Sequence, residues 1–467
     1  MDFIEAFRGV AEKFSHLDRT KPIKIVSNHD CDGIAAAAIL VSAFSKEGIK
    51  FSLSILRQLT NEVLNTFKIE QYETIIFVDI GSNLLSSIEK TLKGKNIFIL
   101  DHHKPEDYKP IFAVHINPYI FNLDGAKDIS AAGVCYLFAK AINEENKDLA
   151  HLAIIGAIGD NQEKNGFYGV NSLIMNEASE FAKLEVKESL RMFGMQTKPL
   201  YKVLEYSTNP YIPNVTGNEK GAIKFLEDIN IKVKDKGKHR RLSDLTEDEM
   251  RRLITAIILK RMGSEENPGD IFGPIYLIKG ENDESPTRDV REFSTLLNCC
   301  GRLGKPSLGI ATCLGDATFK IKAVNLLNQY RRDIIQSLEW FYNHRGTDKV
   351  KEGKGYVLIN AEDSVRDTLI GTLTSIVSKS NLYDDGTVIV GVAHTLGEES
   401  KVSTRIAGFS DSHINLNELV KKILKTTGGE GGGHRLAAGA TIPQEKEEEF
   451  LKLAAQVLNK QVAEEIK

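Results

Sequence analysis

Carboxylates and histidines follow short apolar runs at four places in the first 160 residues of the chain. In sequence order these side chains are His29, Asp30, Asp32, Asp79, Asp101, His102, His103 and Asp160. Aspartate oxygens combined with imidazole nitrogens suit divalent manganese, and suit magnesium less well because of the histidine. Two such ions roughly 3.5–4 Å apart can share a carboxylate, activate a water molecule and stabilise a departing oxygen. The residue types therefore predict a two-metal phosphodiesterase centre.

A single aspartate at the end of a strand is usually a helix cap or a turn residue. The prediction therefore depends on the whole set. The strongest evidence in the set is Asp101-His102-His103, because a purely structural role rarely explains two histidines and an acid directly after an apolar run.

Short apolar runs alternate with helical patterns over the first 190 residues. Strands are expected at 23–27, 51–55, Thr74–Val78 and Asn96–Leu100, and helices at 33–46, 130–143 and 149–158. This alternation predicts a mostly parallel sheet covered on both faces. Ligands bind beyond the carboxyl ends of the strands in such a sheet. We therefore expect the four motifs to converge on one rim.

The later regions differ in pattern. Prolines, a basic run at 232–241 and a T-x-x-E capping box at Thr246 indicate a mainly helical insert. Apolar residues spaced by threes and fours from Ile321 to Phe341 predict a long connecting helix at 317–342. Beyond it, strands are expected at 355–359, 387–393 and 402–408, then a Gly-rich loop at 428–433 and a charged helix at 444–467. The predicted domains are 1–194, 195–285, 286–345 and 346–467. The predicted fold class is α/β, with a smaller α/β domain at the C-terminus.

The composition bears on where the protein is located and on which partners it can bind. Lys+Arg 60 against Asp+Glu 64 give a net charge of −4, so nucleic-acid binding would depend on local basic patches. Five cysteines without a C-x-x-C pair indicate neither a disulfide framework nor a zinc site. The N-terminus has no apolar signal core, and no run approaches the roughly 20 apolar residues of a membrane span. We expect a soluble, cytoplasmic protein without membrane partners.

The H-D-x-D-G, Asp79, D-H-H and G-x-x-G-D motifs resemble the four motifs of the DHH phosphoesterases. The resemblance implies that Asp30, Asp79 and His29 hold one metal ion. It implies that Asp32, Asp79, His102 and Asp160 hold the other, so that Asp79 is shared. His103 would face the scissile phosphate, and Asp101 would orient a neighbouring histidine. Some relatives place a ligand histidine four residues before the first aspartate, where this chain has Val26, which leaves the role of His29 open.

Three later motifs resemble RecJ-type nucleases. Residues 297–302 are similar to the N-A-A-G-R motif of these nucleases, with cysteines in place of both alanines. Residues 403–405 are similar to their S-x-R element. Residues 432–439 are similar to the G-G-H-x-x-A-A-G signature of the DHH-associated C-terminal domain. Arginine forks suit phosphate oxygens, and glycines let backbone N–H groups approach a phosphate closely. The substrate-binding candidates are Asn298, Arg302, Ser403, Arg405, Gly432, Gly433, His434 and Arg57. For Arg57 a surface role is as well supported.

The resemblance implies a manganese-dependent exonuclease for single-stranded DNA or RNA, acting 5′→3′ on DNA in replication or repair. The position of the insert is similar to that in archaeal RecJ-like proteins, which implies the replication-fork GINS complex as a partner. One alternative is a small-molecule enzyme, such as a nanoRNase, a small-nucleotide phosphodiesterase or a pyrophosphatase. Another is a replisome scaffold without catalysis, although every motif acid and both histidines are intact.

Overall fold

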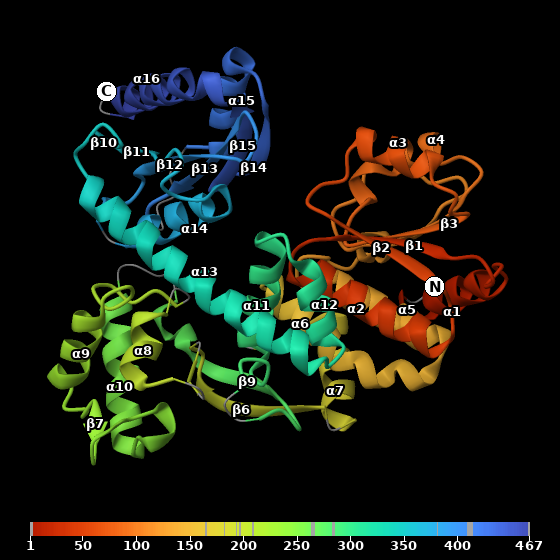
Figure 1. Ribbon diagram of the computed structural model, residues 1–467, viewed down its shortest axis with the longest axis horizontal. Helices are drawn as coiled ribbons and strands as arrows, with labels where there is room; N and C mark the ends of the chain where they lie inside the picture. Colours follow the sequence, from red (N-terminus) through yellow and green to blue (C-terminus); the bar gives the residue numbers. More distant parts are fainter. Residues whose placement is uncertain are drawn as a thin grey trace. The chain divides into compact units, whose positions relative to one another are not determined.

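The computed structural model describes residues 3–163, 166–181, 183–192, 194–195, 198–207, 210–262, 267–282, 285–380, 382–408 and 414–465. The chain divides into two compact units, each considered by itself (Figure 1). Unit 1 comprises Met1–Ser189 and Gly273–Leu327. Unit 2 comprises Leu190–Phe272 and Asn328–Lys467.

Unit 1 contains a five-stranded sheet in the order β2-β1-β3-β4-β5, and every neighbouring pair is parallel. The strands are β1 Ile23–Asn28, β2 Phe51–Leu56, β3 Thr74–Val78, β4 Asn96–Leu100 and β5 Val114–Ile116. The helices are α1 Phe3–Ser15, α2 Cys31–Lys46, α3 Asn61–Ile69, α4 Leu85–Thr91, α5 Ala131–Ile142, α6 Ala150–Gly159, α7 Gly169–Glu180, α11 Val290–Arg302 and α12 Pro306–Cys313. A separate two-stranded sheet pairs β6 Leu184–Leu190 with β9 Phe272–Ile278. The predicted parallel sheet is confirmed.

The sheet of unit 1 is buried on both faces. Helices α3 and α4 cover one face, and α2 and α5 lie on the other (Figure 1). Ile75 and Phe77 of β3 pack with Leu64 and Phe67 of α3. Because side chains alternate along a strand, Ile76 and Val78 point to the opposite face, and they are buried as well. Continuous apolar runs such as Thr74–Val78 are therefore the sequence signature of this sheet.

The first segment of unit 2 is a helical subdomain with its own apolar core. It contains α8 Leu200–Glu205, α9 Glu219–Asp228, a hairpin of β7 Lys234–Asp235 and β8 Lys238–His239, and α10 Glu247–Arg261. Thr246 and Glu249 form the predicted capping box at the start of α10. The predicted long helix is α13 Ala317–His344, whose residues from Asn328 onward belong to unit 2.

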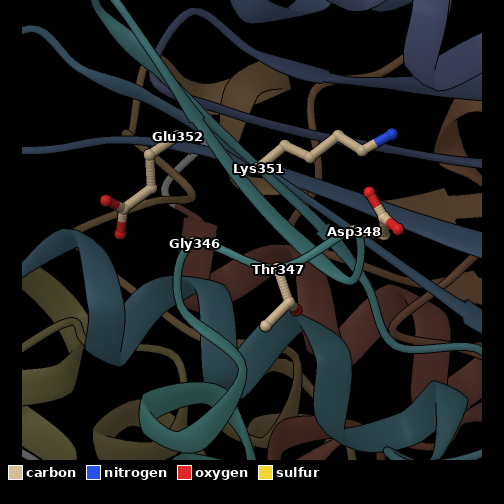
Figure 2. A pocket seen from close by; sticks show the side chains of 5 residues that line it. All are labelled: Gly346, Thr347, Asp348, Lys351 and Glu352. Carbon is tan, nitrogen blue, oxygen red and sulfur yellow. The ribbon is translucent and has the colours of Figure 1, made fainter.

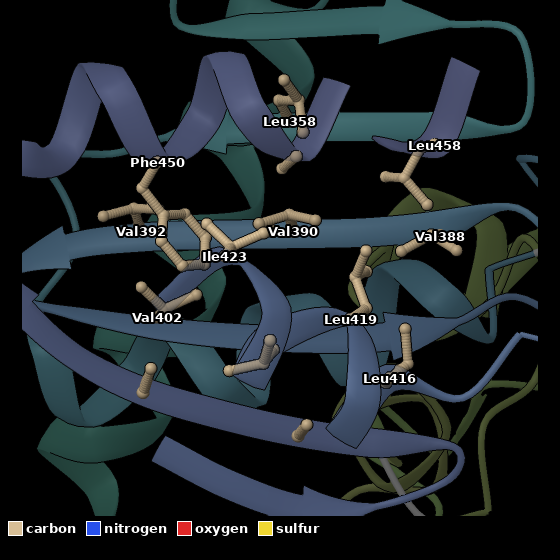
Figure 3. Packing of buried hydrophobic residues seen from close by; sticks show 14 of the residues in the cluster. Leu358, Val388, Val390, Val392, Val402, Leu416, Leu419, Ile423, Phe450 and Leu458 are labelled. Carbon is tan, nitrogen blue, oxygen red and sulfur yellow. The ribbon is translucent and has the colours of Figure 1, made fainter. Parts of the chain in front are cut away.

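The C-terminal part of unit 2 is a six-stranded sheet in the order β10-β11-β12-β13-β15-β14. Its elements are β10 Val350–Gly353, β11 Tyr356–Asn360, α14 Asp367–Ser378, β12 Val388–His394, β13 Glu399–Ile406, α15 Leu416–Thr427, β14 Glu430–His434, β15 Ala437–Pro443 and α16 Glu447–Glu465. Only β11 and β12 pair in parallel; the other neighbours are antiparallel. Figure 3 shows Val390 and Val402 of this sheet packed with Ile423 of α15 and Phe450 of α16. Short 3-10 helices lie at Ser82–Leu84, Pro118–Phe121, Glu144–Leu149, Leu242–Asp244, Pro268–Ile271 and Gln444–Lys446.

Two expectations about secondary structure are wrong in detail. The Gly-rich segment does not form a free loop from 430 onward, because these residues make strand β14, paired with β15. Glycine adopts extended backbone without steric cost, and β15 supplies its hydrogen-bond partners. The strand expected at 402–408 is β13 Glu399–Ile406. Ile321 is 64% exposed, and Ala323 of α13 is buried instead.

No helix in the described part of the chain is long and apolar enough to cross a membrane.

Candidate metal centre

The turn after β1 holds its two carboxylates by helix geometry. Asp30 is the N-cap of α2, and its Oδ1 accepts a hydrogen bond of 3.0 Å from the Gly33 N–H. Its Oδ2 accepts one of 3.1 Å from Asn28 Nδ2. His29 lies in the same turn, with Nδ1 3.1 Å from Asn28 Oδ1. The Asp–Cys–Asp spacing therefore places Asp30 at the N-cap of α2 and directs Asp32 into the interior, where it is buried.

Asp32 is held by the N-terminus of a second helix, α5. Its Oδ2 accepts from the Ala131 N–H at 2.7 Å, and its Oδ1 from the Ala132 N–H at 2.9 Å. A Cβ at Gly156 of α6 would lie 2.3 Å from Asp32 Oδ1, so only glycine fits there. Burial raises the pKa of Asp32 to about 6.

Asp79 begins the turn after β3 in the left-handed region, with φ 59. It is only 1% exposed, and neither of its carboxylate oxygens has a hydrogen-bond partner. Burial, with the charge of Asp30, raises its pKa well above the usual value. A buried carboxylate without a partner is costly, and a bound cation is one of the few ways to stabilise it.

His102 presents one nitrogen to the three carboxylates. Its Nδ1 donates a hydrogen bond of 2.7 Å to the Gly125 carbonyl, so that Nε2 is the nitrogen left to bind a metal ion in the neutral ring. Nε2 lies 3.3 Å from Asp79 Oδ1, 3.7 Å from Asp32 Oδ2 and 3.6 Å from Asp160 Oδ2, yet it has no hydrogen-bond partner. This orientation is typical of a metal-ligating histidine whose other nitrogen is held by a carbonyl.

Among the residues that the structure describes, two groups of side chains are close enough to share an ion. One is Asp79, His102 and His103, and the other is Asp32, His102 and Asp160; the donor atoms of each group lie within 4.8 Å of one another. The donors are oxygen and imidazole nitrogen, and three of the buried donor atoms have no other partner. The residues present therefore fit a centre for divalent cations.

Asp101 and His103 form a pair beside this centre. Asp101 Oδ1 lies 2.9 Å from His103 Nδ1, while its oxygens also accept from the backbone N–H groups of Ser82, His102 and His103. Burial opposes ionisation of Asp101, but the bond to His103 and the charges of both histidines hold its pKa below the usual value. The bond to Asp101 raises the pKa of His103, whose side chain is 52% exposed. Asp101 therefore fixes the orientation of the His103 ring, while the rest of the ring remains accessible to solvent.

A second layer behind the pair was missed by the sequence reasoning. Ser82 Oγ lies 2.9 Å from His115 Nε2, and Asn117 donates to Ser82 Oγ at 2.9 Å and to the His103 carbonyl at 2.8 Å. Burial lowers the pKa of His115 to about 4. Single polar residues in loops carry no periodicity or spacing, so no sequence pattern pointed to them.

Asp160 ends α6 and meets another residue that the sequence reasoning missed. Gln162 Nε2 donates to Asp160 Oδ2 at 3.0 Å and to the Gly125 carbonyl at 2.9 Å. Burial raises the pKa of Asp160. Only the position of Gln162, two residues after the G-x-x-G-D motif, could have drawn attention to it.

The substrate-binding candidates of unit 1 lie on two elements. Asn298 Oδ1 accepts a bond of 3.0 Å from the Cys31 N–H, so only its Nδ2 remains to contact a substrate. Helix α11 approaches the first motif closely, since a Cβ at Gly301 would lie 1.7 Å from the His29 carbonyl oxygen. Arg302 is exposed at the end of α11, and Arg57 is exposed directly after β2.

The candidates of unit 2 lie on three neighbouring strands. Ser403 of β13 pairs with Gly439 of β15, which pairs with Gly432 of β14. Arg405 Nη1 donates to the Thr404 carbonyl at 2.8 Å. Ser403 Oγ lies 3.0 Å from Thr374 Oγ1. Gly433 is exposed in β14, and the side chain of His434 lies outside the described residues. The S-x-R and Gly-rich motifs are therefore aligned across one sheet.

A pocket in unit 2 contains none of these candidates. Gly346, Thr347, Asp348, Lys351 and Glu352 line it at the turn before β10 (Figure 2).

Three family models match successive parts of the chain: the DHH family N-terminal domain at residues 22–157, the DHH-CID domain at 192–271 and the DHHA1 domain at 356–460. An uncharacterized protein of Methanocaldococcus jannaschii is 31% identical over 447 residues, which are 94% of this chain and 94% of that protein. The chain belongs to the DHH family, with DHH, DHH-CID and DHHA1 domains in that order.

Solved structures share the fold. RecJ of Thermus thermophilus in complex with Mn²⁺ matches with a TM-score of 0.59 at 15% identity over 98% of this chain. This chain spans only 55% of that RecJ. CDC45 of Entamoeba histolytica matches with a TM-score of 0.65 at 13% identity over 98% of both chains. The predicted architecture, a parallel-sheet DHH domain, a helical middle part and a C-terminal α/β part built on its own sheet, is confirmed.

Proposed function

We propose that this protein is a metal-dependent exonuclease that hydrolyses phosphodiester bonds of single-stranded DNA or RNA, with manganese as its preferred ion and magnesium as the second choice. The observation that carries the proposal is the set of buried donor atoms without partners, Asp79 Oδ1, Asp79 Oδ2 and His102 Nε2. Membership of the DHH family supports phosphoester chemistry at this place.

In this proposal the carboxylates divide into two ligand sets that share Asp79. Asp32, Asp79, His102 and Asp160 hold one ion, and Asp30, Asp79 and His29 hold the other. Two bound ions lower the pKa of a water molecule and stabilise the leaving oxygen. The proximity of Asp79 to His102 and of His102 to Asp32 and Asp160 supports the first set more directly than the second.

The remaining residues bind and orient the substrate. His103, held by Asp101 and open to solvent, contacts the scissile phosphate, and the bond to Asp101 raises its pKa, which favours its protonated form. Arg302, Arg57 and the Nδ2 of Asn298 bind backbone phosphates next to the cleaved bond. In the C-terminal sheet, Ser403, Arg405, Gly432, Gly433 and His434 bind the strand further along.

The decisive experiment uses single strands of DNA and RNA labelled at either end, with manganese or magnesium, next to dinucleotides as substrates. We expect stepwise shortening of the polymers from the 5′ end of DNA, the polarity that the RecJ resemblance implies. Rapid hydrolysis of dinucleotides with intact polymers would favour the small-nucleotide phosphodiesterase instead.

A second candidate function is a replisome scaffold that binds GINS through the helical segment of unit 2. The likeness to CDC45 and the DHH-CID match support it at the level of fold. Its test is co-purification with GINS, comparing the intact chain with a variant in which Lys234, Lys236 and Lys238 of the exposed hairpin are glutamate. Binding to GINS with full nuclease activity would make the two functions compatible. Binding without any hydrolysis would favour the scaffold alone.

A further inference from the structure

Gln162 lies beside the candidate metal centre without belonging to any motif. It is only 3% exposed, and its side-chain amide contacts parts of three segments. Nε2 donates to the Gly125 carbonyl at 2.9 Å and to Asp160 Oδ2 at 3.0 Å, while Oε1 accepts from Asn171 Nδ2 at 2.7 Å. Both hydrogens of Nε2 therefore have an acceptor.

The geometry fixes which way the Gln162 amide points. If the amide were rotated by half a turn, Oε1 would face the Gly125 carbonyl and the Asp160 carboxylate, and all three are acceptors. Asn171 reinforces the observed orientation, because its own N–H group is directed at Oε1. Asn171 is fully buried in α7, and its backbone N–H is bound to the Asp128 carbonyl at 2.8 Å.

The Gly125 carbonyl is the point where this network meets the histidine ligand. It accepts from His102 Nδ1 at 2.7 Å and from Gln162 Nε2 at 2.9 Å. A Cβ at Gly125 would lie 1.9 Å from the His102 carbonyl oxygen, so the close approach requires glycine. Gln162 thus holds one ligand, Asp160, directly, and a second ligand, His102, through the carbonyl that orients it.

We infer that Gln162 is a positioning residue that sets His102 and Asp160 at the separation at which they bind one ion together. The inference rests on the proposed two-metal function. In the proposed ligand sets, His102 and Asp160 both hold the ion that Asp32 and Asp79 hold, and neither belongs to the set of His29, Asp30 and Asp79. The donor atoms of Asp32, His102 and Asp160 lie within 4.8 Å of one another. Loss of the Gln162 amide should therefore weaken one ion site far more than the other.

The test is calorimetric titration of the full-length protein with Mn²⁺ alone, without nucleic acid. Gln162→Met keeps the length of the side chain and removes the donor. We expect one of two binding steps to weaken by about 10- to 100-fold, the range for residues that support a ligand, and the other to change by less than about threefold. Asn171→Ala, further from the ions, should weaken the same step by a smaller factor.

Asn146→Ala is the matched control. Asn146 is also a fully buried amide in unit 1, and it donates to the Ala139 carbonyl at 2.9 Å. It should lower thermal stability while leaving both Mn²⁺ binding steps unchanged. A second readout is the rate at increasing Mn²⁺, where the rate of Gln162→Met should approach the wild-type rate as its weakened site fills.

The possible outcomes distinguish failure of the inference about Gln162 from failure of the proposed two-metal function. Wild-type protein that binds no divalent ion would overturn both. Wild-type protein that binds two ions, with Gln162→Met binding them equally well, would overturn the inference and leave the function standing. Equal weakening in Gln162→Met and Asn146→Ala would also overturn it, because the effect would then be general loosening of the fold. If Gln162→Met does not fold, Asn171→Ala decides by the same criteria.

Discussion

The two sheets of this protein present their candidate residues in opposite ways. In unit 1 most of the metal-ligand candidates follow the carboxyl ends of parallel strands, and Asp79 and His102 are buried with donor atoms that lack hydrogen-bond partners. In unit 2 the candidates lie within mostly antiparallel strands. There, Ser403 and Arg405 are bonded to Thr374 and to the chain's own backbone. The first arrangement leaves buried donor atoms that a cation would stabilise, whereas in the second Ser403 and Arg405 have hydrogen-bond partners within the protein and Arg405 carries a positive charge that suits an anion.

This difference predicts that the two regions fail differently when mutated. Damage in unit 1 should abolish chemistry, and damage in unit 2 should weaken substrate binding.

The largest effect is expected for Asp79→Asn. Asparagine tolerates the left-handed backbone of this position, where φ is 59, better than alanine does. We expect hydrolysis to fall by about 10⁴-fold, as for loss of a central catalytic group. The metal-free protein should be as stable as wild type or more so, because a buried carboxylate without partners is removed. Rate assays in manganese and melting curves in EDTA measure the two effects. Near-wild-type activity would contradict the two-metal assignment.

A smaller effect, on substrate binding rather than on catalysis, is expected for Arg405→Ala. Loss of a charged hydrogen bond to phosphate should raise KM for single strands by about 10- to 100-fold, with kcat within about threefold. Arg405→Lys keeps the charge and should recover part of the affinity, but not the two-pronged geometry. Steady-state kinetics on labelled strands provide both parameters. A large fall in kcat at unchanged KM would contradict the assignment of catalysis to unit 1 and of substrate binding to unit 2.

The response of stability to pH should differ in sign between Asp32 of unit 1 and Glu249 of unit 2. Asp32 has its pKa raised to about 6 by burial, so the metal-free folded state keeps a proton that the unfolded chain has lost. Its contribution to stability is present below about pH 4 and is lost as pH rises through 6. Glu249 in unit 2 has its pKa lowered to about 2 by the bond to Arg240, so its contribution is present above pH 4.5 and is lost as pH falls toward 2.

Melting temperatures in EDTA between pH 2 and 7 check this prediction. Asp32→Asn should flatten the profile between pH 4 and 6, and Glu249→Gln should flatten it below pH 4.5. An unchanged slope in either variant would mean that the carboxylate does not titrate as its surroundings indicate. Saturating Mn²⁺ should remove the slope due to Asp32, because the ion binds the deprotonated carboxylate.

The smallest effect concerns the helical segment of unit 2. Thr246 and Glu249 form a reciprocal capping box at α10. Thr246→Ala should cost about 1 kcal/mol in urea denaturation and leave Mn²⁺ binding unchanged. Thr60→Ala is the matched cap in unit 1; because its bond to the Val63 N–H is long, at 3.4 Å, and has no reciprocal partner, it should cost less. Equal costs would mean that the capping box adds nothing.

Much of the fold could be predicted from the sequence, because buried parallel strands and amphipathic helices have strong local signatures. The strand at Thr74–Val78 and the helix that starts after Thr246 were placed within a residue or two. Strand β14 was not predicted, because a run of glycines has no side-chain pattern and becomes a strand only when β15 lies beside it.

For the candidate site, the sequence by itself determined the types of donor and the likeness to the DHH superfamily, since aspartate and histidine at strand ends carry their chemistry wherever they lie. Only the tertiary structure decided which of them meet. It directs Asp32 between the N-terminus of α5 and Gly156, leaves Asp79 without a hydrogen-bond partner, and turns Nε2 of His102 toward three carboxylates. It also introduces Gln162 and Gly125, because such contacts depend on distances between segments far apart in the chain, which local patterns do not encode.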